Sequence, residues 1–378
     1  MIDFLFVFIF GAVIGWYFTR KLKSLQRVQI VHETDQNYSN ALNAIVDKDY
    51  EKAQKLLMDT IDNDPDNIMA YQRLAELKFN HGNYVKALKI FEIITMRSFI
   101  SKESSALAYR WYGKTAEKLK KYDIAIDAYN RVLNILPLDI ESLKALESLY
   151  ETNKNWNKAL SYTKKIEEIT NKDNKMHEAY LLFCKAQDNF NAGNLKDAEK
   201  SAEEAIEKDE LCIPAYIIMG DILFKKEEKK EAKKNWDKVL EIKPDLGYLV
   251  FKRLEKFYFE NDEYEKMRFI YEQLLTSNPK NAITHAALGN LFYNMENYDK
   301  AQIEYKESFQ NGYFTKEILQ NFFKICKKEN RFNDFIIEIE MIINNVEKDF
   351  KNRCSACQYT DKDYFWKCPL CGKMSYYA

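Results

Sequence analysis

The sequence predicts an all-α protein made of stacked helical hairpins, and three observations support this. Only 10 Gly and 6 Pro interrupt 378 residues, few for a chain rich in loops. Hydrophobic residues make up 46% of the chain and charged residues 30%, which is ordinary for a folded protein. Similar short strings recur about every 34 residues, a period typical of helical repeats. The formal net charge of −1 provides no basic excess toward phosphates, so we expect no nucleic-acid partner.

We predict that the first segment, residues 1–19, is a single membrane-spanning helix. The sequence FLFVFIFGAVIGWYF, from Phe4 to Phe18, carries no charge. Ile2 and Thr19 extend it close to the roughly 17–25 residues that cross a bilayer. A cleaved signal peptide fits poorly, because no basic residue precedes the run. The other alternative is a buried core helix, which the run resembles less because it is apolar on every side.

Basic residues directly after this segment predict its orientation. The positive-inside rule places the side richer in Lys and Arg in the cytoplasm, so the N-terminus would face outward and the bulk of the chain inward. Gly11 and Gly15 form a GxxxG pattern that would let a partner's transmembrane helix pack closely, with chance occurrence as the alternative. The basic residues are Arg20, Lys21, Lys23 and Arg27, in a linker predicted over 20–37.

The predicted repeat region, residues 38–350, contains nine copies of one short pattern. Each copy ends in a landmark residue, and successive landmarks are 34, 38, 34, 39, 34, 35, 34 and 34 residues apart. We place the extra residues of the two longer steps in turns near 96–105 and 170–175. The landmarks are Ala53, Ala87, Ala125, Ala159, Ala198, Ala232, Met267, Ala301 and Phe335.

Prolines and small residues recur at fixed distances from the landmarks of this pattern. Four of the six prolines lie 12 residues after a landmark, where a helix must end: Pro65, Pro137, Pro244 and Pro279. Small residues lie 12 before a landmark, where they let paired helices approach closely: Ala41, Ala75, Gly113, Ala186, Gly220 and Gly289. The pattern resembles the tetratricopeptide repeat (TPR) family over about nine helical hairpins. That resemblance implies a superhelical solenoid with a concave binding surface.

A TPR array implies a binding role, and we expect the protein not to be an enzyme. The sequence contains no GxGxxG, GxxxxGK[ST] or HExxH motif. Two basic pairs at i, i+4 spacing would suit an acidic partner segment, namely Arg110 with Lys114 and Lys252 with Lys256. The alternative for both pairs is a solvated charged face.

The C-terminal segment, residues 351–378, contains four cysteines with the spacing C-x2-C-x10-C-x2-C. Two CxxC pairs bring four thiolates into a tetrahedron, which suits one zinc or iron ion. A metal would also explain how so short a segment folds without an apolar core of its own. Two disulfides or redox-active CxxC pairs are the alternatives, and the reducing cytoplasm disfavours the first. The expected ligands are Cys354, Cys357, Cys368 and Cys371.

The three parts together resemble the lipopolysaccharide assembly protein B (LapB) family, membrane-anchored TPR proteins with a C-terminal rubredoxin-type metal-binding domain. The resemblance rests on GWYFTRK at Gly15–Lys21, the repeats with two lengthened steps, and NRCSACQYTDKDYFWKCPLCGKMS at Asn352–Ser375. Phe365 and Trp366 before CPLC match the family pattern. Gln358 replaces the usual glycine after the second cysteine, so we expect a looser first knuckle.

The LapB resemblance implies an inner-membrane adaptor that regulates lipopolysaccharide synthesis. Its implied partners are the membrane protease FtsH and the deacetylase of the lipid A pathway, which FtsH degrades. One alternative is a membrane-tethered TPR scaffold for another envelope complex. A second is a rubredoxin-like iron protein that transfers electrons. The sequence leaves a homo-oligomer open.

Overall fold

The computed structural model describes residues 20–21, 35–97, 101–260, 262–345, 352–361 and 363–375. The predicted membrane anchor, residues 1–19, with Gly11 and Gly15, lies outside this range, so the anchor stays a prediction. Within the described ranges, no helix is both long enough and apolar enough to span a membrane.

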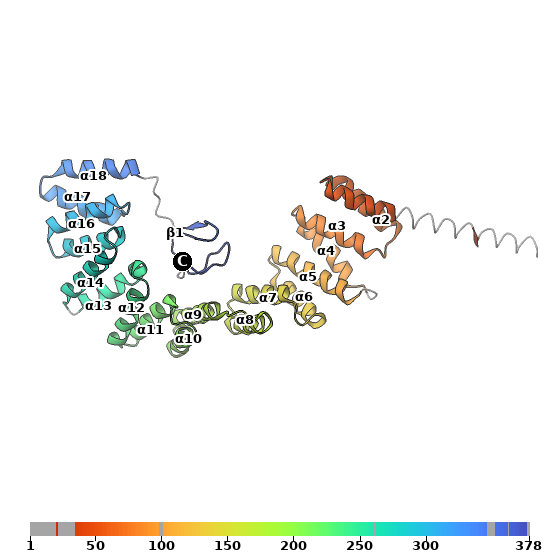
Figure 1. The fold of residues 1–378 in the computed structure, drawn as a ribbon, viewed down its shortest axis with the longest axis horizontal. Helices are drawn as coiled ribbons and strands as arrows, with labels where there is room; N and C mark the ends of the chain where they lie inside the picture. Colours follow the sequence, from red (N-terminus) through yellow and green to blue (C-terminus); the bar gives the residue numbers. More distant parts are fainter. Residues whose placement is uncertain are drawn as a thin grey trace, which may run out of the picture. The chain divides into compact units, whose positions relative to one another are not determined.

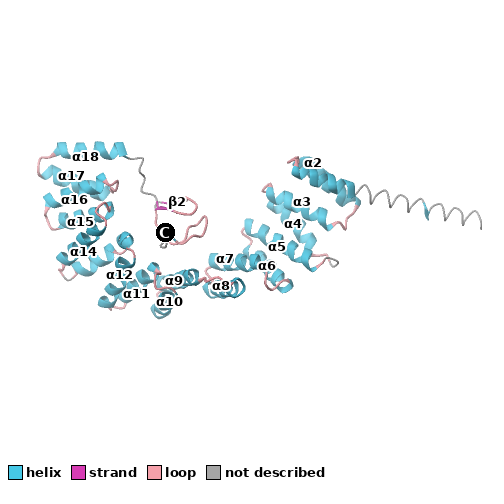
Figure 2. Ribbon diagram, viewed as in Figure 1, coloured by secondary structure: helices cyan, strands magenta, loops and turns pink. Residues whose placement is uncertain are grey.

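Helices form nearly all of the described chain up to Asn345, which confirms the predicted all-α TPR solenoid (Figures 1 and 2). A first helix over 35–46 pairs with α2, and the later helices pair as α3/α4 through α17/α18, with the 3-10 helix η1 before α13. The first helices of the later pairs are α3 (Ile68–Asn80), α5 (Lys102–Lys118), α7 (Ile140–Thr152), α9 (Lys175–Asn191), α11 (Ile213–Lys225), α13 (Phe251–Phe259), α15 (Ala282–Asn294) and α17 (Lys316–Lys328). The second helices are α2 (Tyr50–Asn63), α4 (Tyr84–Thr95), α6 (Tyr122–Ile135), α8 (Trp156–Thr170), α10 (Leu195–Lys208), α12 (Lys229–Ile242), α14 (Tyr264–Ser277), α16 (Tyr298–Gln310) and α18 (Phe332–Asn345), and η1 spans Pro244–Leu249.

The chain divides into two compact units, Met1–Lys172 and Asp173–Ala378. The first unit contains the hairpins up to α8. The second contains the hairpins from α9 onward and the cysteine-rich tail.

The two lengthened repeat steps extend helices, whereas the sequence pattern placed the extra residues in turns. Helices α5 and α9 have 17 residues each, against 13 in α3, α7, α11 and α15. Both begin 23 residues before their landmark alanine, while the 13-residue helices begin 19 before theirs. The four additional residues therefore add about one turn to the first helix of a hairpin. A pattern of spacings cannot distinguish a longer turn from a longer helix.

Alanines at most landmark positions let the two helices of a hairpin pack closely. Seven of the nine landmarks are alanines, and all seven are fully buried. The small residue 12 positions before the landmark, on the first helix, faces a large aromatic side chain of the second helix. A Cβ added at Gly289 would lie 2.7 Å from the ring of Tyr305, and one at Gly220 would overlap the indole of Trp236. The aromatic ring therefore occupies the space that a side chain on the first helix would need.

Every hairpin reverses direction through a residue in the left-handed conformation, five residues before the landmark. Only two of these nine turn residues are glycines. The N–H of the following residue closes the turn. For example, the N–H of Asn297 donates to the carbonyl oxygen of Phe292 at 2.9 Å. The turn residues are Lys48, Gly82, Lys120, Lys154, Gly193, Glu227, Asp262, Glu296 and Asn330.

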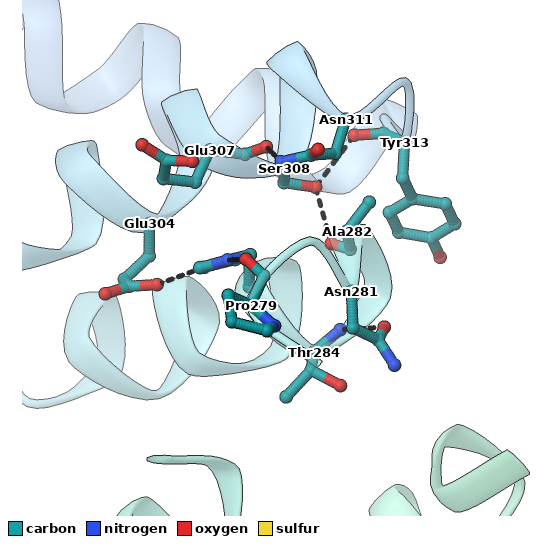
Figure 3. A network of polar contacts seen from close by, with 10 residues as sticks. Pro279, Asn281, Ala282, Thr284, Glu304, Glu307, Ser308, Asn311 and Tyr313 are labelled. Atoms are coloured by element: carbon teal, nitrogen blue, oxygen red, sulfur yellow. Dashed lines mark hydrogen bonds and ion pairs between the residues drawn. The ribbon is translucent and has the colours of Figure 1, made fainter. Parts of the chain in front are cut away.

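A buried histidine, His285, ties α15 to α16 and to the turn before α15. Figure 3 labels its two partners, Glu304 and Pro279. Nδ1 of His285 lies 2.6 Å from Oε2 of Glu304, and Nε2 lies 2.9 Å from the carbonyl oxygen of Pro279. Both partners are acceptors, which suits an imidazolium that donates from both nitrogens. Burial opposes the charged form, but the bond to Glu304 and the contact with Pro279 together raise the pKa of His285.

We expect Gly220→Ala to lower the free energy of unfolding by about 1–3 kcal/mol, because the new methyl group overpacks against Trp236. Chemical denaturation of the purified protein measures this loss. Gly113→Ala is the matched control, since its Cβ would lie 3.0 Å from the ring of Tyr129 and needs only a small shift. Equal losses in the two variants would contradict the packing argument.

The His285 network should make stability depend on pH. Because the folded pKa is raised, the stabilisation is fully present below the unfolded pKa of about 6.5 and is lost as pH rises through the folded value. The difference in unfolding free energy between wild type and His285→Gln should therefore narrow as pH rises above about 6.5. Glu304→Gln, which removes the carboxylate partner, should reduce the same pH dependence. A constant difference at every pH would show that His285 is not charged in the fold.

Candidate metal centre

Two short turns and a two-stranded hairpin position the cysteine residues of the tail. Strand β1 (Asn352–Arg353) pairs antiparallel with β2 (Thr360–Asp361), with Asn352 opposite Asp361. The second CxxC turn is closed by an antiparallel bridge between Lys367 and Met374. Each cysteine pair thus lies in a turn flanked by paired backbone.

The two CxxC turns have matching backbone hydrogen bonds. In the first, the N–H of Cys354 donates to the carbonyl of Tyr359 at 2.7 Å, and the N–H of Gln358 donates to the carbonyl of Cys354 at 2.9 Å. In the second, Cys368 donates to Lys373 and Gly372 donates to Cys368, both at 2.8 Å. The two turns are therefore alike in their main-chain geometry.

The looser first knuckle expected from Gln358 is not observed. Gln358 adopts a φ of 62°, close to the 74° of Gly372, and makes the same hydrogen bond. A left-handed non-glycine residue costs about 1–2 kcal/mol. The first turn therefore keeps its form at an energetic cost that the second turn avoids.

The four cysteine side chains converge on one point, with all four sulfur atoms within 4.8 Å of one another. Sγ of Cys354 lies 3.5 Å from Sγ of Cys371, and Sγ of Cys357 lies 3.6 Å from Sγ of Cys368. Zinc–sulfur bonds of about 2.3 Å in a regular tetrahedron give sulfur–sulfur edges of about 3.8 Å. A disulfide requires about 2.05 Å, and all four cysteines are free thiols. The cluster therefore fits a tetrahedral metal ion.

The thiols of the cluster differ in how readily they ionise. The backbone N–H of Cys357 stabilises the thiolate of Cys354 and lowers its pKa to about 6. The backbone N–H of Tyr359 favours the thiolate of Cys357 too. Desolvation and hydrogen bonds to the neighbouring sulfurs outweigh it and raise the pKa of Cys357 to about 12. A metal ion must therefore displace protons from this cluster, so acid should weaken its binding.

Two cysteines of the cluster are buried, and one lies at the surface. Cys354 and Cys368 are 3% and 1% exposed, whereas Cys371 is exposed. The tail also contacts α9, because Nζ of Lys367 lies 5.6 Å from the ring centre of Tyr180. A metal bound by these thiolates would thus sit close to the protein surface.

Of the predicted partner-binding residues, Arg110 is already paired within the fold. It contacts Asp139, and its Nη1 lies 3.3 Å from Oε2 of Glu141. Nζ of Lys114 lies 4.9 Å from the ring centre of Trp111, and a cavity of about 390 Å³ opens beside both basic residues. The sequence pattern did not reveal that Trp111 lines this cavity, because aromatic residues of TPR helices are usually assigned to the core.

The second basic pair, Lys252 and Lys256, belongs to the other unit of the chain. Both side chains are exposed, and Nζ of Lys256 lies 4.8 Å from the ring centre of Phe224 in the preceding hairpin. Lys256 on Phe224 repeats the arrangement of Lys114, which lies 5.8 Å from the ring of Phe79. The role of these two pairs in partner binding stays a prediction.

Fold and site together define a class, namely TPR proteins with a tetracysteine knuckle after the repeats. A model of the tetratricopeptide repeat family matches residues 213–246, which include α11 and α12. Among solved structures, a TPR protein from Parabacteroides merdae covers 78% of this chain with a TM-score of 0.37 and 15% identity, and 98% of that structure is covered. The TPR protein YrrB covers 50% of this chain with a TM-score of 0.34 and 20% identity, and 93% of it is covered.

The chain is similar to lipopolysaccharide assembly protein B along almost its whole length. The Escherichia coli K12 protein is 20% identical over 380 residues, which cover 98% of this chain and 96% of the relative. The Haemophilus influenzae protein is 20% identical over 387 residues with the same coverage. This full-length similarity, with the repeat match and the cysteine cluster, confirms the resemblance to the LapB family.

Replacing Cys368 and Cys371 with Ser should abolish metal binding, because two of the four thiolates are lost. Elemental analysis of the purified protein measures the loss as a fall from one ion per chain to none. Cys212→Ser and Cys326→Ser, which remove buried thiols outside the cluster, should leave the metal content unchanged. Metal retained in the double variant would refute the assignment.

Proposed function

We propose that this protein is a non-enzymatic adaptor in lipopolysaccharide assembly, tethered to the inner membrane. The observation that supports the proposal most is the collinear similarity to LapB, which extends over 98% of this chain. A shared repeat alone would align only the array. Here the alignment also includes the region of the predicted anchor and the cysteine-rich tail.

The nine hairpins would supply the binding surface for partner proteins. The first helices of a TPR array line its concave side, and Arg110, Lys114, Lys252 and Lys256 all lie on such helices. Lys114 and Lys256 rest on aromatic rings, so each presents a cation beside apolar surface. A partner segment that combines carboxylates with apolar side chains would fit both places.

The proposed mechanism brings two partners together at the membrane. Residues 1–19 would hold the array on the cytoplasmic face, with the N-terminus outside, and so raise its effective concentration near membrane proteins. The array would bind the deacetylase of the lipid A pathway, and the protease FtsH would then degrade it. Gly11 and Gly15 would face a partner's transmembrane helix. The adaptor itself performs no chemistry in this scheme.

A zinc or iron ion held by Cys354, Cys357, Cys368 and Cys371 would stabilise the tail rather than react. Four thiolates leave no open coordination position for a substrate. The residues contribute by orienting their sulfurs and by excluding water from Cys354 and Cys368. The exposed position of Cys371 favours one alternative, a rubredoxin-like iron centre that exchanges electrons at the surface. An iron protein would be red, whereas a zinc protein is colourless.

Depletion of the protein should lengthen the half-life of the deacetylase and raise lipopolysaccharide output. Pulse-chase measurement of the deacetylase tests this directly. The intact chain should restore degradation, whereas a chain without residues 1–19 should fold yet fail to restore it, because it lacks the tether. An unchanged deacetylase half-life after depletion would contradict the proposed mechanism. The alternative is a scaffold for another envelope complex. Proteins that co-purify from detergent-solubilised membranes would then identify that complex.

A further inference from the structure

The last three hairpins expose an apolar side chain at the same point of the repeat, two residues after the landmark. Phe269 in α14, Ile303 in α16 and Ile337 in α18 are 58%, 59% and 60% exposed. We call this row of three residues the outer ridge. The six earlier hairpins have a polar or charged residue at this point, namely Lys55, Lys89, Asp127, Ser161, Lys200 and Lys234. The apolar row is therefore confined to the last three of the nine hairpins.

The outer ridge points away from the first helices. Successive residues of an α-helix are about 100° apart around its axis, so a residue two positions after the landmark lies on the opposite side of the helix. Met267 and Ala301 are fully buried in their hairpins, which turns Phe269 and Ile303 outward. Helices α14 to α18 follow one another in the stack, and α16 contacts α18 (Figure 1). The ridge therefore crosses neighbouring hairpins.

An open groove of about 510 Å³ lies between α14 and α16, beside this ridge. Leu275 and Ile303 line it from these two helices, and Leu288 and Phe292 line it from α15. Grooves with apolar walls accept the apolar face of a helix from another protein. Ridge and groove together therefore offer a continuous apolar contact rather than isolated exposed side chains.

Acidic residues border the ridge on both sides. Residues three or four positions apart share one face of a helix, so the acids one turn before and one turn after each ridge residue lie beside it. Together α14, α16 and α18 contain eight acidic and four basic residues, whereas the six earlier second helices contain sixteen of each. The bordering acids are Glu265, Asp299 and Asp334 on one side and Glu272, Glu307 and Glu340 on the other.

Cations from outside these three helices do not remove the acidic excess. Oδ1 of Asp299 lies 3.8 Å from Arg331, and Oε2 of Glu304 lies 2.6 Å from His285. Glu340 is exposed and has no ion-pair partner among the described residues. The surface around the outer ridge is therefore apolar along its centre and negative at its borders.

We propose that the outer ridge binds an amphipathic helix of a partner protein. The apolar face of that helix would lie on Phe269, Ile303 and Ile337, and its lysines or arginines would lie beside the two acidic rows. The acidic excess disfavours two other occupants. It would repel an anionic lipid surface, and a second copy of this chain would bring acidic rows against acidic rows. The proposal requires neither the lipopolysaccharide function nor the concave surface described above.

Fluorescence anisotropy with the metal-loaded full chain in detergent tests the proposal, with the same detergent alone as the blank. The probe is a labelled peptide of about 18 residues, long enough to form a helix, with leucines at i, i+3, i+4 and i+7 spacing and lysines elsewhere. This peptide should bind, and less tightly as salt is added. The same peptide with glutamate in place of lysine should not bind. Equal binding of the two peptides, or none of the first, would overturn the proposal.

Substitutions in the ridge locate the binding. Phe269→Ser, Ile303→Ser and Ile337→Ser should each weaken binding of the lysine peptide by roughly tenfold, because each removes one apolar contact. All three side chains are exposed, so the variants should fold. Val85→Ser is the matched control, since Val85 is 59% exposed on the second helix α4 of an early hairpin. If the ridge variants bind as tightly as this control, the proposal fails.

Two further measurements examine the other occupants. In nanodiscs that contain brominated lipid, the full chain with Ile337→Trp should be quenched no more than wild type. Additional quenching would assign the ridge to the bilayer and contradict the proposal. Sedimentation in detergent should give the same mass for wild type and Ile303→Ser. A smaller mass for the variant would assign the ridge to a second copy of the chain and contradict the proposal too.

Discussion

Close contact between the two helices of each hairpin is the constraint on which this structure depends. A small residue on one helix faces a large one on the other, as Gly220 faces Trp236 and Gly289 faces Tyr305. The landmark alanines provide the same close approach from the second helix. Because each hairpin buries its remaining apolar surface only against its neighbours, the array is stable as a stack and not as separate pairs.

The sequence predicted the repeat architecture well, because the repeat appears as a regular spacing of residues. Alanine landmarks, the phase of Pro65, Pro137, Pro244 and Pro279, and the helix pairs agree with the structure. Spacing could not show that α5 and α9 absorb the extra residues, because helix and turn lengths add to the same period. It also could not reveal the turns at residues such as Lys154 and Glu296, since neither side chain favours a positive φ. Glycine is scarce in the chain, yet each hairpin has a left-handed turn residue.

The clustering of the four cysteines was predictable for a different reason. Tetrahedral coordination demands four ligands, and two cysteine pairs spaced as C-x2-C-x10-C-x2-C supply them from two short turns. The departure at Gln358 misled the prediction, because the backbone hydrogen bonds and the flanking strands hold the first turn in place without a glycine. A cavity of about 250 Å³ beside the cluster was beyond sequence reasoning. Its lining joins Lys243 to Arg353 and Lys373, which only the folded tail brings together.

The left-handed turns have a consequence for how far this protein could be changed. Seven of the nine hold lysine, glutamate, aspartate or asparagine in a conformation that glycine adopts without penalty. Each of these repeats therefore retains an unused stabilising substitution at the same position. The turns could therefore be strengthened hairpin by hairpin through substitution to glycine, without changing the helices, the cysteine cluster or the surfaces that would meet a partner.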